Sequence, residues 1–272
     1  MIRRPLCVLF VLLLFGCKPP PPEAPTDLGE LAVYLYREFD NDDPAVMAAG
    51  LRNLDEFLVD LDWPALDEDS SRQGREWQLP LLAVEDRTGL PQIEGMLPED
   101  QLVVGVAYRS RFAVPEHLPL VALTDQTPIE AASSASYDRT FLSDVDCFVE
   151  GLCEELETHN TVHRDQLLLD IVYEAFKDFR RVDAEPGSGA ALVARSWTEE
   201  RFFGEAGQNS IDQSYSLEVW LPREGGALRF MTYWNQMTIP ALSDSNIVLN
   251  LMGAGMDEIF ENTEDFLGGE GD

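Results

Sequence analysis

The stretch that decides the fold lies at residues 215–238 and reads YSLEVWLPREGGALRFMTYWNQMT. Apolar side chains recur at every second position of its first half, at Tyr215, Leu217, Val219 and Leu221. Successive side chains of a strand point to opposite faces, so this alternation predicts a half-buried strand. The segment Arg223-Glu224-Gly225-Gly226 predicts a tight turn that closes a hairpin onto a second strand, Leu228 to Thr238.

Trp220 lies on the other face of the first predicted strand, beside Ser216 and Glu218. A large aromatic side chain at this position has two explanations. Either a helix covers this face of the sheet, or Trp220 is an exposed contact point for a partner.

The regions on either side of the hairpin extend this pattern. A turn at Pro186-Gly187-Ser188-Gly189 leads into a further strand that ends at Trp197, and a final helix is expected from about Ser245 to Phe266. Gly253 and Gly255 each weaken that helix by about 1 kcal/mol relative to alanine. We infer that they let its backbone lie close to a sheet.

A long antiparallel meander followed by a C-terminal helix resembles the element order of START-like helix-grip domains. That resemblance implies an α+β fold in which the sheet wraps the helix around an apolar pocket for a lipid or polyketide. The fold class predicted here is therefore α+β, with an N-terminal helical hairpin, an antiparallel meander and a C-terminal helix packed on the sheet. A fold alone does not establish a pocket.

The N-terminal part of the domain reads as two helices joined by an acidic turn. Asp27 and Glu30 form a capping-box-like start, and Asp43-Pro44 begins the second helix. The apolar stripes of both segments predict a helical hairpin over residues 27–62, within one α+β domain at 27–267. The acidic residues 268–272 are expected to be disordered.

The middle of the chain gives weaker signals. Strands are predicted at Trp77 to Val84, Leu102 to Tyr108 and Leu118 to Leu123, followed by a loop at Thr124 to Ala135 and a helix from about Tyr137 to Glu157 that is interrupted at Gly151. Residues 167–182 fit helical spacing, but their Val, Tyr and Phe content also suits a strand.

The N-terminus reads as a targeting segment. Two arginines precede the unbroken apolar run Leu6 to Phe15, which is about half the ~20 residues needed to span a bilayer. Leu14-Phe15-Gly16-Cys17 resembles the lipobox of bacterial lipoproteins. The resemblance implies a signal peptide at 1–16, a lipid on Cys17 and anchoring in the cell envelope. The proline-rich residues 17–26 read as a tether. Lys18 is not the aspartate that retains enterobacterial lipoproteins in the inner membrane, so the same resemblance implies the outer membrane.

The remaining cysteines, Cys147 and Cys153, form an even pair in a chain expected to be exported, so a disulfide is favoured. Along a straight helix their Cα atoms would lie about 9 Å apart, beyond the ~7 Å that a disulfide tolerates. The backbone must therefore turn between them, and Gly151 is where it can.

Composition excludes one class of partner. The chain has 50 acidic and 19 basic residues, a formal net charge of -31, and such a surface repels nucleic acid. Two histidines, His159 and His163, could reach one metal ion from a helix, but surface histidines beside a disulfide are the simpler interpretation. No cofactor is implied, because no nucleotide or metalloprotease motif is present.

The sequence therefore favours a lipid-anchored envelope protein that binds an apolar ligand or an envelope protein without catalysis. The alternative is a hydrolase with carboxylates that match no known motif. An enzyme needs titratable groups with shifted pKa values converging in a cleft, whereas a binding module needs an apolar cavity or patch.

Overall fold

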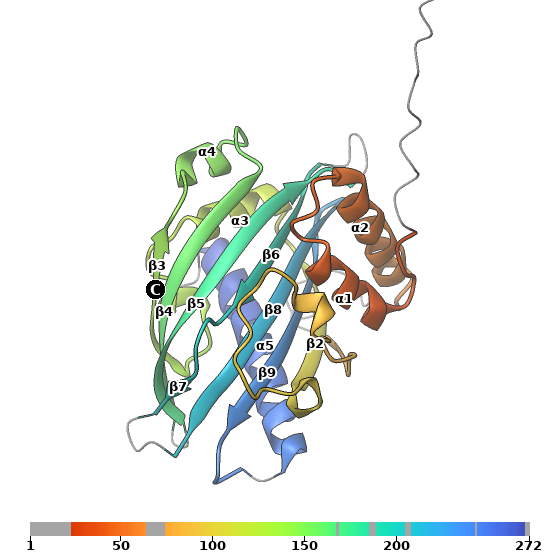
Figure 1. Ribbon diagram of the computed structural model, residues 1–272. Helices are drawn as coiled ribbons and strands as arrows, with labels where there is room; N and C mark the ends of the chain where they lie inside the picture. The colour runs from red at the N-terminus through yellow and green to blue at the C-terminus, as the bar shows by residue number, and fades with distance from the viewer. Residues whose placement is uncertain are drawn as a thin grey trace, which may run out of the picture.

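The computed structural model describes residues 23–63, 74–166, 169–184, 189–204, 208–242 and 244–269. Within them, an antiparallel sheet of nine strands has the order β1-β2-β9-β8-β6-β5-β4-β3, with β7 paired to β8 (Figure 1). The strands are β1 (Arg75–Trp77), β2 (Leu102–Ser110), β3 (Ser134–Phe141), β4 (Glu155–Gln166), β5 (Leu169–Val182), β6 (Ala191–Trp197), β7 (Phe202–Phe203), β8 (Ser210–Arg223) and β9 (Gly226–Thr238). The helices are α1 (Leu28–Arg37), α2 (Pro44–Val59), α3 (Val114–Val121), α4 (Val145–Val149) and α5 (Ser245–Gly268). Three short 3-10 helices are η1 (Glu85–Arg87), η2 (Pro98–Asp100) and η3 (Thr127–Ile129).

The predicted hairpin is confirmed and forms the centre of the sheet. Strands β8 and β9 pair antiparallel with Tyr215 opposite Trp234, and both are longer than the alternation indicated. Gly225 has a φ of 77°, which glycine adopts without the steric cost that other residues carry. The turn therefore closes where the sequence placed it.

The N-terminal helical hairpin is also confirmed. The carboxylate of Asp27 accepts hydrogen bonds from the first turn of α1, and that of Asp43 accepts one from Ala45 in α2. Both helices pack on one face of the sheet, where Leu217, Val219 and Phe230 contact their apolar stripes. This main core lies on the face of the sheet that carries the alternating apolar residues of β8, as the sequence predicted.

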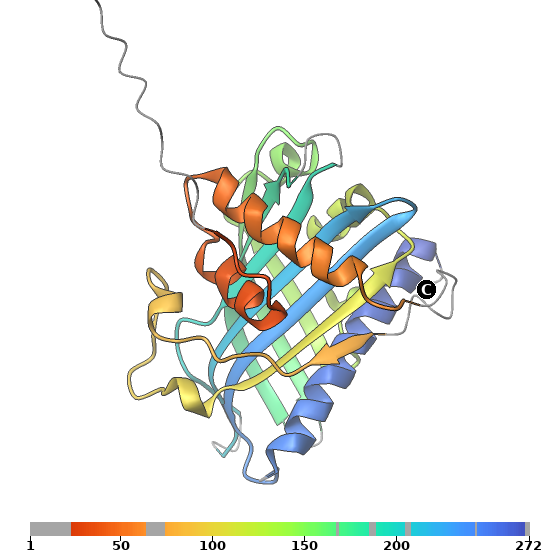
Figure 2. The ribbon, with the colours of Figure 1, turned by 90° about the vertical axis from the view of Figure 1, so that its right-hand side faces the viewer.

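Helices α5 and α3 cover the opposite face (Figure 2). Trp220 is buried there beside Leu118 of α3, so the covered explanation is correct and the exposed one is wrong. Because helices lie on both sides, both faces of β8 are buried.

Two of the early strand predictions are wrong. Residues Leu118 to Leu123 lie mostly in α3, whose first turn is held by the Glu116 carboxylate accepting from the amide of Ala113 at 2.7 Å. Of Trp77 to Val84, only Trp77 lies in a strand. Strand β2 is confirmed at Leu102–Ser110 and pairs with β9.

The helix predicted from Tyr137 to Glu157 is wrong. Its two ends are strands β3 and β4, paired to each other, and only Val145–Val149 is helical. The ambiguous segment 167–182 is a strand from Leu169 onwards, paired to β4 and β6. Long-range pairing with neighbouring strands overrides the local helical spacing here.

The predicted disulfide between Cys147 and Cys153 is present, with Cα atoms 5.3 Å apart. The backbone turns at Gly151, which has a φ of 77°, as the distance argument required. The amides of Leu152 and Cys153 donate to the carbonyl of Cys147, so this turn closes the C-terminal end of α4.

The predicted signal segment 1–16, Cys17 and most of the tether lie outside the described residues, as do residues 270–272 of the predicted tail. Helix α5 ends at Gly268, one residue past the predicted domain boundary. None of the helices in the part of the chain that the structure describes is long and apolar enough to span a membrane.

Candidate functional site

The site is formed where α5 crosses the sheet. The ring of Phe260 stacks on Tyr108 of β2 with centroids 4.2 Å apart, and the Tyr108 hydroxyl donates to Asp257 at 2.6 Å. Farther toward its N-terminus, Gly253 lies beside β1, where an added Cβ would come within 3.2 Å of the Glu76 carboxylate. The inferred close approach of this glycine to the sheet is therefore correct.

A cavity of about 360 Å³ lies between the N-terminal half of α5 and the sheet. Its walls come from α5, from β4, β5, β8 and β9, from the link between β9 and α5, and from the segment just before β3. The apolar and aromatic lining residues are Ala131, Leu169, Tyr173, Ile211, Tyr233, Met237, Ile239, Leu242, Val248, Leu251, Met252, Gly255, Met256 and Ile259. This volume is within the range of small-molecule sites.

Glycine contributes directly to the space in this cavity. Gly255 lies in the middle of the helix face that lines it, and a Cβ added there would meet nothing within 4 Å. The second helix glycine thus leaves the cavity open, whereas Gly253 allows contact with β1. One role was inferred for both glycines from the sequence, and the structure separates them.

The polar lining residues are few, namely Ser133, Arg164, Ser214 and Asn235. The hydroxyl of Ser214 donates to Asn235 Oδ1 at 2.6 Å, and Arg164 forms an ion pair with Glu130 at 3.2 Å. Burial raises the pKa of both Tyr173 and Tyr233, so these side chains line the cavity as neutral phenols. The cavity is mainly apolar with a neutralised polar edge.

We infer that the cavity opens to solvent beside the first turns of α5. Leu251 lines it and is 55% exposed, and Ile247, one helical turn earlier, is 47% exposed. A cavity wall that is also exposed to solvent provides an entry route for a ligand. Apolar side chains exposed at such an opening are typical of a binding site.

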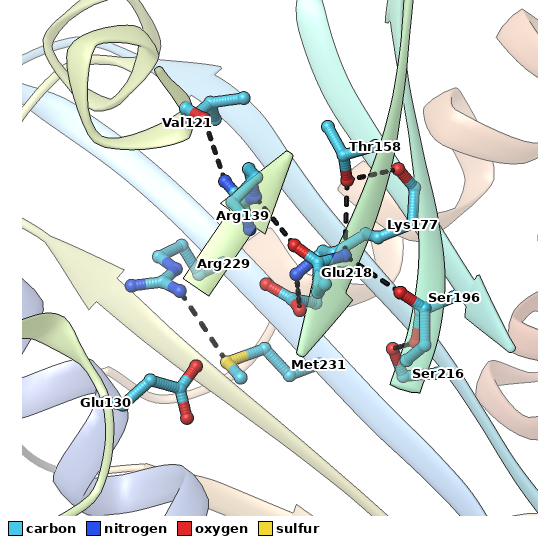
Figure 3. Close-up of polar contacts among 12 residues, drawn as sticks. Val121, Glu130, Arg139, Thr158, Lys177, Ser196, Ser216, Glu218, Arg229 and Met231 are labelled. Carbon is cyan, nitrogen blue, oxygen red and sulfur yellow. Dashed lines mark hydrogen bonds and ion pairs between the residues drawn. The ribbon is translucent and has the colours of Figure 1, made fainter. Parts of the chain in front are cut away.

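A second, smaller cavity of about 50 Å³ lies beneath the C-terminal half of α5, and Tyr233 and Ile259 line both cavities. Its walls carry the buried charges of Arg139, Glu218 and Arg229 and the half-buried charge of Lys177 (Figure 3). Lys177 and Glu218 form an ion pair with each other. Interaction with Lys177 and Arg229 outweighs burial and lowers the pKa of Glu218, so this carboxylate is ionised.

His117 borders the same small cavity as a neutral side chain. Burial, together with the positive charge of Arg229, lowers the pKa of His117 to about 3. Its Nδ1 lies 3.0 Å from the carbonyl of Ala113, a distance that suits an N–H donor on that nitrogen.

The two candidate metal ligands, His159 and His163, do not lie in a helix. Both lie in β4, where residues four apart are separated by about 13 Å, too far to share one metal ion. His159 Nε2 lies 3.3 Å from Glu174, and His163 Nε2 lies 2.9 Å from Asp170, across the strand pair in each case. Among the described residues, no cluster of three or more His, Cys, Asp or Glu side chains could hold a metal ion.

One carboxylate has a markedly raised pKa, as the hydrolase alternative would require. Burial raises the pKa of Asp178 to about 6. The positive charge of Arg195 opposes this rise, and the negative charges of Glu157 and Asp40 add to it. However, Asp178 lies beside Arg195, whose guanidinium stacks on Phe39 of the helical-hairpin segment. It is therefore on the opposite face of the sheet from both cavities.

Sequence reasoning did not identify the lining of either cavity. One signal was present in the hairpin, because Glu218 and Arg229 both lie on the face opposite its apolar residues, next to Trp220, Met231 and Tyr233. Charges mixed with large apolar side chains on one strand face indicate a buried polar site rather than a solvated surface.

Comparisons with known proteins find distant similarities in structure alone. No family model matches the chain, and no curated protein matches it. A STAR-related lipid transfer protein fragment from Xanthomonas axonopodis has a TM-score of 0.41 and 11% identity, over 63% of this chain and 89% of that one. Human StAR-related lipid transfer protein 5 has a TM-score of 0.44 and 8% identity, over 83% and 97%.

A protein of Thermus thermophilus has a TM-score of 0.42 and 12% identity, over 62% of this chain and 98% of that one. Similarities at these scores assign neither a family nor a ligand to this chain. What the chain itself shows is an α+β fold in which a long C-terminal helix closes a mainly apolar cavity against an antiparallel sheet.

Proposed function

We propose that this protein is a non-enzymatic binding module that holds a small apolar ligand in the cavity beneath the N-terminal half of α5. The observation that carries the proposal is the cavity of about 360 Å³, with its mainly apolar lining and its opening beside Leu251. An apolar molecule moved from water into such a space gains about 25 cal/mol for each Å² of surface buried.

The lining suits ligands of more than one shape. Met237, Met252 and Met256 all face the cavity, and unbranched thioether side chains adapt to irregular partners. Few hydrogen-bonding groups are available to orient a ligand, so apolar contact supplies most of the affinity.

The test is to fill the cavity from the helix side. The purified chain is titrated with N-phenyl-1-naphthylamine, an uncharged dye whose emission rises in apolar surroundings. The wild type should bind it, and Gly255→Phe should weaken binding at least tenfold, because the ring occupies space that is open at Gly255. The matched control is Ala254→Phe, which adds the same ring at an exposed position of the same helix and should leave binding unchanged.

Two results would contradict the proposal. One is a wild-type chain that does not bind the dye. The other is equal binding by both phenylalanine variants, which would place the dye elsewhere on the molecule.

We also propose that the domain is anchored to the outer membrane of a bacterial cell envelope through a lipid on Cys17. The lipobox-like segment and the proline-rich tether support this, and the Cys147–Cys153 disulfide is typical of exported proteins. Cys17→Ser should abolish acyl labelling and membrane fractionation. Unchanged labelling of that variant would refute the anchor.

A further inference from the structure

The small cavity under the C-terminal half of α5 contains an arginine whose donors are not used. Arg229 is 3% exposed, and its Nε and Nη1 have no hydrogen-bond partner among the described residues. Its only hydrogen-bond contact in that part of the chain joins Nη2 to the sulfur of Met231 at 3.7 Å (Figure 3). A buried guanidinium without an oxygen acceptor is costly, since its N–H donors have lost water and gained no hydrogen bond in return.

The surroundings of Arg229 stabilise its charge only in part. Its guanidinium lies 5.1 Å from the ring centroid of Trp220 and 5.6 Å from that of Phe260. Burial lowers the pKa of Arg229, and the carboxylates of Glu218 and Glu264 oppose this shift without reversing it. The guanidinium nevertheless remains charged, because arginine does not lose its proton in proteins.

The nearby carboxylates are already engaged by other cations. Glu218 is paired with Lys177, and Glu130 with Arg164. Glu264 accepts from Ser110 and lies 3.5 Å from the guanidinium of Arg111. None of these ion pairs includes Arg229.

A second cation at the cavity also lacks a carboxylate. Arg139 is 5% exposed, and it donates to the side-chain oxygen of Asn160 at 2.9 Å and to the carbonyl of Val121 at 2.8 Å, both neutral acceptors. Among the described residues, Arg139 and Arg229 therefore bring two positive charges to the small cavity that no ion pair neutralises.

The space beside these cations fits a small charged group. One water molecule needs a cavity volume of roughly 10–15 Å³. The small cavity, at about 50 Å³, therefore accommodates a few water molecules or one carboxylate. The fork of a guanidinium matches the two oxygens of a carboxylate. The apolar cavity lies next to it, across Tyr233 and Ile259.

We propose that the small cavity binds an anionic head group, a carboxylate, on Arg229, while the apolar tail of the same ligand occupies the large cavity. This inference rests on the proposed function and names its ligand class, an amphiphilic carboxylic acid. A free anion from solution offers the same chemistry to Arg229, so the test separates the two sources.

The experiment compares three competitors at pH 8 against N-phenyl-1-naphthylamine on the wild-type chain. These are dodecanoate, the uncharged dodecanol, and acetate, which has the charge without the tail. Dodecanoate should displace the dye at a concentration at least tenfold below that of dodecanol, and acetate should not displace it. Arg229→Met should remove the advantage of dodecanoate while leaving dye and dodecanol binding unchanged.

A second measurement guards against misfolding of the variant. Arg229→Met puts an apolar side chain in place of a buried charge that belongs to none of the ion pairs described above, so its melting temperature without ligand should exceed that of the wild type. The matched control is Arg195→Met. Arg195 is 4% exposed on the other face of the sheet and is paired with Asp40 and Asp178, so its loss should lower the melting temperature but keep the preference for dodecanoate.

If the proposed function is wrong, the wild-type chain will not bind the dye at all. The head-group site is tested only on a chain that binds the dye, so the two failures are distinguishable. Equal displacement by dodecanoate and dodecanol in the wild type would overturn the head-group site, as would an unchanged preference in Arg229→Met. If, in addition, acetate raised the melting temperature of the wild type but not of Arg229→Met, the anion would come from solution and the head-group assignment would be wrong.

Discussion

We predict that alanine substitutions at Gly253 and Gly255, two neighbouring positions of α5, change the stability of the protein by different amounts. Replacing glycine by alanine in a helix interior stabilises it by about 1 kcal/mol, because alanine loses less backbone freedom on folding. At Gly255 the added methyl group meets nothing within 4 Å, so Gly255→Ala should keep this whole gain. At Gly253 the methyl group would lie 3.2 Å from the Glu76 carboxylate, a contact that must relax at some cost.

The expected free energies of unfolding follow directly. Gly255→Ala should be more stable than the wild type by about 1 kcal/mol, equivalent to a rise of about 2–4 °C in melting temperature for a chain of this size. Gly253→Ala should gain less than half of that, or lose stability. In a chain that already carries Glu76→Ala, the further change Gly253→Ala should give the full gain of about 1 kcal/mol, since the obstructing carboxylate is then absent.

The assay is urea unfolding of the purified chains at pH 7.5, followed by tryptophan fluorescence and by circular dichroism. A gain at Gly253 equal to or larger than that at Gly255 would refute the reasoning. It would mean that Gly253 of α5 does not lie against Glu76 of β1 as described.

Three further predictions concern charge and covalent structure. The pKa of His117 is about 3 in the folded chain and 6.5 in the unfolded chain, so as pH falls the unfolded chain takes up the proton first and is favoured. From pH 6 to 4, the free energy of unfolding of the wild type, measured in urea, should fall by about 1.4 kcal/mol per pH unit more than that of His117→Gln. Equal slopes for the two chains would contradict this. The pKa of Asp178 is raised from 3.8 to about 6, so the stability that its protonated form contributes is lost as pH rises from 3.8 to about 6 and stays lost above that. Asp178→Asn should therefore raise the melting temperature at pH 8 but not at pH 4. Closing the short loop between Cys147 and Cys153 should contribute about 2 kcal/mol, lost in Cys153→Ser, and alkylation of the unreduced wild type at either cysteine would argue against the disulfide.

The parts of the fold predicted correctly share one property: their signals lie within a few neighbouring residues. The hairpin at 215–238 combines alternation with a glycine turn, and Gly225 adopts the positive φ that such a turn uses. The α1–α2 hairpin begins at Asp27 and Asp43, both of which cap their helices as predicted. The turn at Gly151 follows from the reach of a disulfide.

The wrong predictions lie where distant contacts override local pattern. Residues Leu118 to Leu123 have the composition of a strand, but Trp220 of β8 covers them and the Glu116 cap starts a helix before them. The segment predicted as a helix from Tyr137 has its two ends in β3 and β4, which pair with each other, and residues 169–182, which also fit helical spacing, pair with β4 and β6. Propensity is a weak prior where the edge of a sheet offers a full ladder of hydrogen bonds.

By itself, the sequence determined the strand pair, the helix starts, the constrained cysteine pair and the final helix, because each depends on residues close together in the chain. Only the tertiary structure decided that α5 closes a cavity with Leu169, Ile211 and Met237, and that Arg229 is buried next to it without an oxygen partner among the described residues. The physical reason is that a cavity is a property of surfaces brought together by packing, and no local pattern records which side chains will face the same space.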